Sequence, residues 1–156
     1  MPYAAIVPVP FGALGLVMRG AVLAGIDFLP PYTTPQPARD EAIAHVVAQL
    51  QAYFRDPSTG FDLVLEPVGS PFQQRVWLAL RAIPCGQVLT YAELARRVGS
   101  SPRAVGQAVG DNPLPIVIPC HRVVGRHDLG GFAHARSGPM LAIKRWLLSH
   151  EGALGR

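Results

Sequence analysis

Cysteine is scarce in this chain of 156 residues, which contains only Cys85 and Cys120. Two thiols cannot build the dense disulfide framework that stabilises small secreted proteins. A free, reactive thiol persists best in a reducing compartment, so we expect a cytoplasmic protein.

Long apolar runs are also missing. No segment approaches the roughly 20 apolar residues that a membrane span needs, and the start, Met1-Pro2-Tyr3, lacks the basic flank and apolar core of a secretory signal. We therefore expect no membrane partner. Charged residues make up 15% of the chain and apolar residues 49%, a balance typical of a folded protein. The length suits one domain or two small ones.

Acidic residues are few in the second half of the chain. Residues 68–156 carry eleven Lys and Arg against four Asp and Glu, a net charge of +7. Residues 1–67 carry three Arg against six acids, a net charge of −3. The basic half fits a polyanionic partner, and arginine suits phosphate contacts. A solvated basic surface would explain the same count.

Short apolar runs punctuated by glycine predict an antiparallel meander at the start of the chain, with strands at 3–9, 13–18 and 21–28. Apolar residues at helical spacing then predict an amphipathic helix over roughly 39–55. The segment Phe61 to Leu65 is interpreted as one more strand.

The segment Glu66-Pro67-Val68-Gly69 is interpreted as a linker, because the charge balance changes sign there. We expect a sheet-and-helix domain over residues 1–67 and a helical domain over residues 68–156. Capping signatures at Ser70 and Thr90 open the first two helices of the second domain. Its helices are expected over roughly 70–83, 90–98, 102–109 and 139–150.

The two central helices flank the turn Gly99-Ser100-Ser101, an outline that fits a helix-turn-helix or an ordinary helical hairpin. The second of them is rich in Ala and Gly, so it can approach nucleic acid closely without reading its sequence. In the glycine-rich loop 125–138, His127 and His134 lie seven residues apart with no further cysteine nearby. We therefore expect no metal site.

Cys120 and His121 are adjacent and follow an apolar run and Pro119. An imidazole beside a thiol can take its proton and make it a nucleophile, provided that the chain turns there. The alternative is a buried, inert cysteine beside a surface histidine.

Four motifs of the second half, in this order, resemble the O6-alkylguanine-DNA alkyltransferases, also called methylated-DNA–protein-cysteine methyltransferases. The resemblance covers residues 69–152, and its most specific part is the Pro-Cys-His-Arg core with the upstream Asn-Pro. The motifs are Gly86-Gln87-Val88-Leu89-Thr90-Tyr91, Arg103-Ala104-Val105-Gly106, Asn112 to Val123 and Lys144 to Gly152.

The resemblance implies an α/β protein in which a small antiparallel sheet with a helix (ribonuclease-H-like) precedes a mostly helical, winged helix-turn-helix-like DNA-binding domain. It implies single-turnover transfer of an alkyl group from guanine O6, or from O4-alkylthymine, to Cys120, with no cofactor. His121 would take the thiol proton and Glu151 would orient the imidazole. Tyr91 would donate to the departing base, and Asn112 would support the turn.

The resemblance also implies a monomer that binds duplex DNA in the minor groove, independently of sequence, and extrudes the damaged base. Arg103 would fill the space that the base leaves. The other DNA-contacting residues implied are Ser101, Ala104, Gly106 and Arg122. The substrate pocket implied consists of Tyr91, Pro119, Val123, Phe132 and Ala133.

The chain departs from the family pattern in the loop before the last helix, where Gly131-Phe132 leads into an altered and longer connection up to Leu141. Asp111 replaces a residue that is commonly neutral or basic, and the first half has no cysteines for the zinc site of some relatives. Two alternatives stay open. One is a lesion sensor that binds without transfer, although such sensors replace the acceptor cysteine; the other is a Cys-His-Glu acyl transferase or peptidase.

Overall fold

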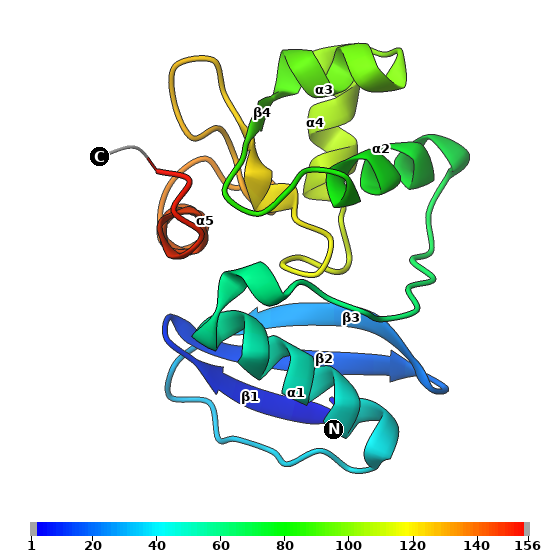
Figure 1. Cartoon of the computed structure of the whole chain (residues 1–156), viewed down its shortest axis with the longest axis vertical. Helices are drawn as coiled ribbons and strands as arrows, with labels where there is room; N and C mark the ends of the chain where they lie inside the picture. Colours follow the sequence, from blue (N-terminus) through cyan, green and yellow to red (C-terminus); the bar gives the residue numbers. More distant parts are fainter. Residues whose placement is uncertain (1–2, 155–156) are drawn as a thin grey trace. The chain divides into compact units, whose positions relative to one another are not determined.

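Three strands near the start of the chain form an antiparallel meander, and one helix lies across a face of it (Figure 1). The structure is a computed structural model that describes residues 3–154. Asp40 caps the helix, because its side chain accepts a hydrogen bond from the Ile43 amide at 3.1 Å. The elements are β1 (Ala5–Val9), β2 (Gly12–Arg19), β3 (Val22–Leu29), α1 (Glu41–Arg55) and a 3₁₀ turn, η1 (Pro57–Thr59).

The core of this part lies between the sheet and the helix. Leu14 and Leu16 of β2 are fully buried, and so are Ile43 and Leu50 of α1. The antiparallel register pairs Leu14 with Val7 of β1 and with Phe28 of β3. The predicted meander and helix are therefore confirmed.

The predicted strand from Phe61 to Leu65 is wrong. Its only ladder contact is an isolated bridge between Leu65 and Leu23. The Gln49 side chain binds both backbone groups of Asp62, because its Oε1 accepts from the Asp62 amide at 2.8 Å and its Nε2 donates to the Asp62 carbonyl at 2.9 Å. A side chain of α1 thus takes the backbone hydrogen bonds of Asp62 that a strand would have used, so the segment does not form a continuous strand with the sheet.

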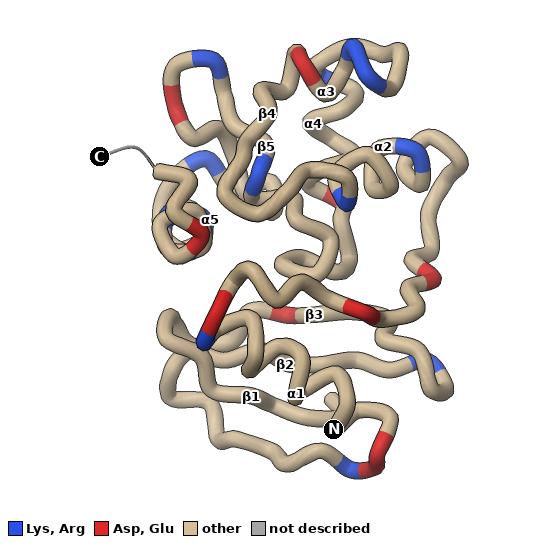
Figure 2. Tube along the Cα trace, in the orientation of Figure 1, with Lys and Arg blue, Asp and Glu red and all other residues tan. Residues whose placement is uncertain are grey.

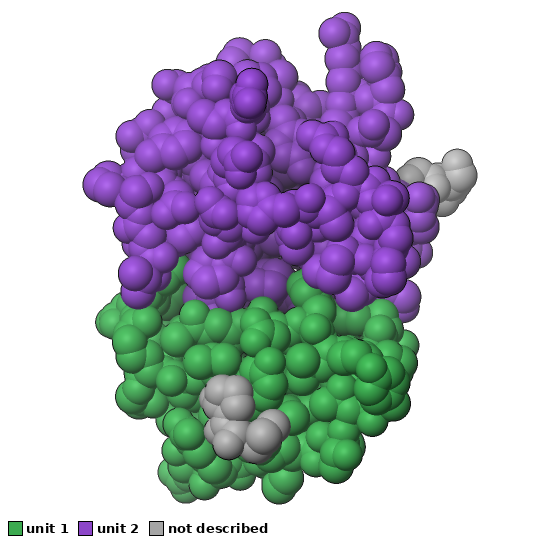
Figure 3. Space-filling view, turned by 180° about the vertical axis from the view of Figure 1, so that it is seen from behind, with its two compact units in different colours: residues 1–67 green, residues 68–156 purple. Residues whose placement is uncertain are grey.

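The chain divides into two compact units, Met1–Pro67 and Val68–Arg156 (Figure 3). The boundary falls within the segment interpreted as a linker. Figure 2 shows the basic and acidic residues along the trace of each unit.

The second unit is built mainly from helices, as predicted: α2 (Pro71–Arg81), α3 (Tyr91–Val98), α4 (Pro102–Gly110) and α5 (Pro139–His150). Both expected capping boxes, at Ser70 and Thr90, are formed. The indole of Trp77 on α2 donates to the Ala108 carbonyl on α4 at 2.8 Å and ties these two helices together.

A two-stranded parallel pair, which the sequence did not predict, joins distant parts of this unit. β4 (Leu89–Thr90) pairs with β5 (Val123–Val124), which follows the 3₁₀ turn η2 (Cys120–Arg122). Because α3 begins directly after β4, this pairing brings Tyr91 to the same region as Cys120. Within residues 3–154, no helix combines the length and the apolar character needed to cross a bilayer.

Candidate active site

The segment before Cys120 forms a tight turn that the Asn112 side chain holds. Asn112 Nδ2 donates to the Ile118 carbonyl at 2.8 Å, and Asn112 Oδ1 accepts from the Leu114 amide at 2.9 Å. Ile116, which is buried, lies in the left-handed region with φ = 76°, an unfavourable conformation for a β-branched residue. Asn112 thus closes a strained loop, which agrees with the supporting role expected for it.

Cys120 opens the 3₁₀ turn η2 and is buried, with only 4% of its surface exposed. Burial raises the pKa of its thiol to about 11, although a hydrogen bond from Asn112 and the positive charge of Lys144 act in the opposite direction. The resting sulfur is therefore a protonated thiol at neutral pH, and it needs a base to become a nucleophile.

His121 and Glu151 form a fully buried pair, although 30 residues separate them in the chain. The distance from His121 Nε2 to Glu151 Oε2 is 2.7 Å. Because the carboxylate can only accept, the hydrogen lies on Nε2, and Nδ1 keeps a lone pair. No described protein group bonds to that buried Nδ1. Burial lowers the pKa of His121, while Glu151 raises it, so the imidazole is neutral at pH 7 and available as a base.

The side chain of Arg122, which was predicted to contact DNA, lies mostly inside the protein. Its Nε and Nη2 donate to the two oxygens of Glu151 at 2.9 and 3.0 Å, and its Nη1 donates to the Ile83 carbonyl at 2.6 Å. The side chain is only 12% exposed. Its guanidinium is committed to holding Glu151 in place, so its contribution to the site is internal.

Lys144, for which the sequence predicted no role, is a fully buried lysine on α5. Its Nζ donates to the carbonyls of Val123, Leu129 and Gly131 at 2.6, 2.5 and 2.8 Å. Burial lowers the pKa of Lys144 to about 8, whereas the nearby Cys120 and Asp128 raise it. Three carbonyls satisfy all three ammonium donors, so this lysine ties the loop after the cysteine to the last helix.

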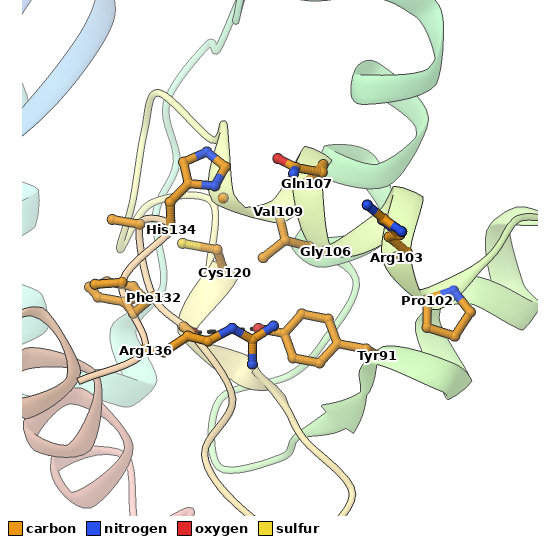
Figure 4. A pocket seen from close by; sticks show the side chains of 14 residues that line it. Tyr91, Pro102, Arg103, Gly106, Gln107, Val109, Cys120, Phe132, His134 and Arg136 are labelled. Carbon is orange, nitrogen blue, oxygen red and sulfur yellow. Dashed lines mark hydrogen bonds between the residues drawn. The ribbon is translucent and has the colours of Figure 1, made fainter.

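A cavity of about 560 Å³ opens over Cys120 (Figure 4). The Tyr91 hydroxyl points toward the loop and donates to the Gly131 carbonyl over a long 3.4 Å. Burial raises the pKa of Tyr91, so it stays a protonated donor. The lining residues are Tyr91, Pro102, Arg103, Gly106, Gln107, Val109, Gly110, Cys120, Gly131, Phe132, Ala133, His134, Ala135 and Arg136.

Three of the five predicted pocket residues, Tyr91, Phe132 and Ala133, line this cavity, and two do not. Val123 is fully buried in β5, where its carbonyl accepts from Lys144. Pro119 is buried and precedes the turn. Both residues flank the 3₁₀ turn that carries Cys120, and the Val123 amide donates to the Cys120 carbonyl.

The predicted DNA-contacting residues of α4 divide by position. Arg103 and Gly106 line the cavity, whereas the Ser101 hydroxyl caps the helix by accepting from the Ala104 amide at 3.1 Å. Lining residues that the sequence did not predict include Gln107, His134 and Arg136. The last two belong to the altered loop, whose conformation no pattern in the sequence indicates.

Among residues 3–154, no three His, Cys, Asp or Glu side chains are grouped closely enough to hold a metal ion. His134 instead pairs with Asp111, with 2.8 Å between Nε2 and Oδ1.

The site therefore consists of a protonated thiol, a neutral imidazole with a buried carboxylate behind it, and a phenol across a cavity large enough for a small planar ligand. Such a set can transfer a carbon group to sulfur.

Comparison with known proteins places this geometry in a family context. Residues 71–153 match the family described as 6-O-methylguanine DNA methyltransferase, DNA binding domain. A methylated-DNA–protein-cysteine methyltransferase of Mycolicibacterium paratuberculosis is 41% identical over 145 residues, which are 87% of this chain and 88% of that protein.

Solved structures agree over nearly the whole chain. The crystal structure of Mycobacterium tuberculosis O6-methylguanine methyltransferase is 36% identical, covers 97% of this chain and 93% of its own, and has a TM-score of 0.80. A structure of Mycobacterium tuberculosis OGT in complex with DNA is 38% identical, covers 95% of this chain and 91% of its own, and has a TM-score of 0.79.

Proposed function

The chain belongs to the family of methylated-DNA–protein-cysteine methyltransferases, and we propose that it repairs O6-alkylguanine in duplex DNA by moving the alkyl group onto Cys120. DNA is accordingly its partner, and it is a transferase that consumes itself. The observation that carries the assignment of Cys120 is its position in the cavity, directly before a buried histidine that pairs with Glu151.

The transfer begins when the Cys120 proton moves to His121, directly or through a water. The new imidazolium is stabilised by Glu151 at 2.7 Å, which Arg122 holds in place from the other side. The sulfur then attacks the alkyl carbon on guanine O6, so that a carbon–sulfur bond forms as the carbon–oxygen bond breaks. The released guanine takes up a proton in place of the alkyl group, and this balances the thiol proton lost.

Negative charge builds on the guanine as the bond breaks, and Tyr91 is the donor that faces it. Because its pKa is raised by burial, its hydroxyl can stabilise that charge without ionising. The product is a thioether, which ordinary thiols do not reverse. Each molecule therefore acts once.

A guanine stacked in a duplex cannot reach a buried thiol, so the base must be extruded into the cavity. Arg103 stands at the start of α4, on the rim of the cavity, where its side chain can fill the space left in the duplex. The small side chains of α4 allow a close approach to the minor groove without base reading. Because neither Cys85 nor Cys120 forms a disulfide, a reducing cytoplasm is the location that fits best, and a monomer suffices for this chemistry.

The test is intact-mass measurement after incubation with a duplex that contains one O6-methylguanine. The protein should gain one methyl group per molecule. Cys85→Ala is the matched control and should gain the methyl group as the wild type does, whereas Cys120→Ala should gain none. Tight binding of the duplex without any gain in mass would contradict the proposal and favour a lesion sensor.

A further inference from the structure

The altered loop crosses the cavity as a tight turn with two residues in an unusual conformation. The Phe132 and Ala135 backbones exchange hydrogen bonds at 2.8 and 2.9 Å, and the two residues between them, Ala133 and His134, have φ values of 50° and 66°. Positive φ at both central positions defines a type I′ turn, which favours Asn and Gly. Because Ala and His do not favour it, contacts outside the turn must hold it in place.

One such contact is the packing of the His134 ring against α4. The imidazole packs against Gly110, where even a Cβ atom would overlap its ring atoms. Only glycine at this position lets the ring lie against the helix. His134 lines the same cavity as Cys120 (Figure 4), so its packing against Gly110 also fixes the position of one wall of the cavity.

The second contact is the bond from His134 Nε2 to Asp111 Oδ1 at 2.8 Å. Asp111 is itself held, because it ends α4 and its Oδ2 accepts from Gln73 Nε2 at 3.0 Å. Gln73 in turn belongs to the capping box of α2, where its Oε1 accepts from the Ser70 amide at 2.8 Å. The loop is therefore tied, through two side chains, to the rigid start of a helix.

We propose that the His134–Asp111 pair is a latch that holds the 131–138 loop over the cavity, and that the seated imidazole limits the size of the alkyl group accepted. This specificity role rests on the proposed function. Both side chains are about half exposed, at 49% and 44%, and such pairs contribute little to global stability. Loss of the latch is therefore expected to change the shape of the cavity without unfolding the protein.

The experiment compares transfer rates on two duplexes that are identical except for the lesion, O6-methylguanine in one and O6-benzylguanine in the other. Any general effect on DNA affinity cancels in the ratio of the benzyl rate to the methyl rate. The variants are His134→Asn, Asp111→Ala and the double variant. Asparagine tolerates the positive φ but is too short to reach Asp111, so it removes the latch and keeps the turn. The matched control is His127→Asn. His127 is an exposed histidine of the glycine-rich loop 125–138, and it does not line the cavity.

Each single variant should raise the benzyl-to-methyl ratio about tenfold, the order that a change in pocket size produces. The double variant should raise it no further, because both changes break one contact, and His127→Asn should leave it at the wild-type value. An unchanged ratio in both single variants, or additive effects in the double variant, would overturn the latch while leaving the proposed function intact. A wild-type protein that takes up neither alkyl group would instead overturn the proposed function itself.

Discussion

At the scale of single residues, burial keeps both the acceptor sulfur and its base uncharged before the reaction. Burial raises the pKa of Cys120 to about 11 and lowers that of His121, because a low-dielectric site disfavours both the thiolate and the imidazolium. The ground state is thus neutral. Proton transfer from Cys120 to His121 creates a thiolate and an imidazolium. Glu151, held by Arg122, stabilises the imidazolium because it already lies 2.7 Å from the imidazole.

Glu151→Gln should slow methyl transfer about 100-fold or more, since the imidazolium that forms would lose its stabilising charge. The pH profile supplies a second readout. In the wild type, the pKa of His121 lies below its ordinary value of 6.5, so the imidazole is still neutral at pH 6.5. The transfer rate should therefore be constant down to that pH and fall only at lower pH. Glu151 raises the pKa of His121, so its removal should move this acid limb to still lower pH.

The measurement is the single-turnover transfer rate across the pH range at saturating DNA. A rate reduced without any displacement of the acid limb would mean that Glu151 acts only in packing, and would contradict its role toward His121. DNA affinity, measured separately, should not change, because Glu151 is buried away from solvent.

At the scale of elements, α4 combines small residues with one long cation at its start. Ser101 caps the helix and Pro102 occupies its first turn, so the helix begins at a defined point and presents Arg103 on the rim of the cavity. The same element carries Gly110 near its end, where it accommodates the His134 ring. One helix thus carries both the arginine proposed to enter the duplex and the glycine against which the loop packs.

Arg103→Ala should slow repair of O6-methylguanine in duplex DNA by about 10-fold or more, because extruding a stacked base costs a few kcal/mol that an inserted side chain offsets. The rate of attack on free O6-benzylguanine should stay close to that of the wild type, since a free base needs no extrusion. The check is the pair of rates measured side by side. Equal losses on both substrates would show that Arg103 acts inside the cavity instead.

At the scale of the whole molecule, charge is divided unevenly between the two halves of the chain. Residues 68–156 carry a net charge of +7 and residues 1–67 a net charge of −3. Figure 2 marks the positions of basic and acidic residues along the Cα trace. Most of the affinity for DNA should therefore come from phosphate contacts of the second unit, and such contacts release counterions.

Duplex binding should weaken by about tenfold or more when salt rises from about 50 to 200 mM, with a linear dependence of log K on log salt concentration. Affinity titrations at four or five salt concentrations would measure the slope. Reaction with free O6-benzylguanine, which is uncharged, serves as the control and should barely respond. A flat dependence for the duplex would rule out phosphate contacts as the main source of affinity.

Local patterns predicted most elements of the molecule. The capping residues Ser70 and Thr90 marked the starts of α2 and α3, because a capping box acts within four residues. The strand predicted from Phe61 to Leu65 was wrong for the opposite reason. The side chain of Gln49, which is distant in sequence, takes the backbone hydrogen bonds of Asp62. The pairing of β4 with β5 was missed because two-residue strands leave no periodicity to read.

The site shows the same division. Motif resemblance indicated Cys120, His121 and Glu151 together, although spacing alone could not bring residues 30 apart into one pair. Lys144 begins one of the family motifs without a predicted role, and only the fold shows that it donates to three backbone carbonyls. Arg122 was expected on the DNA face, yet the position of Glu151 draws it inward.

By itself, the amino-acid sequence determined which helices form, where a thiol and an imidazole are adjacent and that the second half is basic, because capping, residue chemistry and charge are properties of short segments. Only the tertiary structure decided how strongly burial opposes ionisation of the Cys120 thiol, which carbonyls accept hydrogen bonds from Lys144 and where the altered loop lies. Those outcomes depend on dielectric environment and on contacts between segments far apart in the chain, and these exist only after the chain has folded.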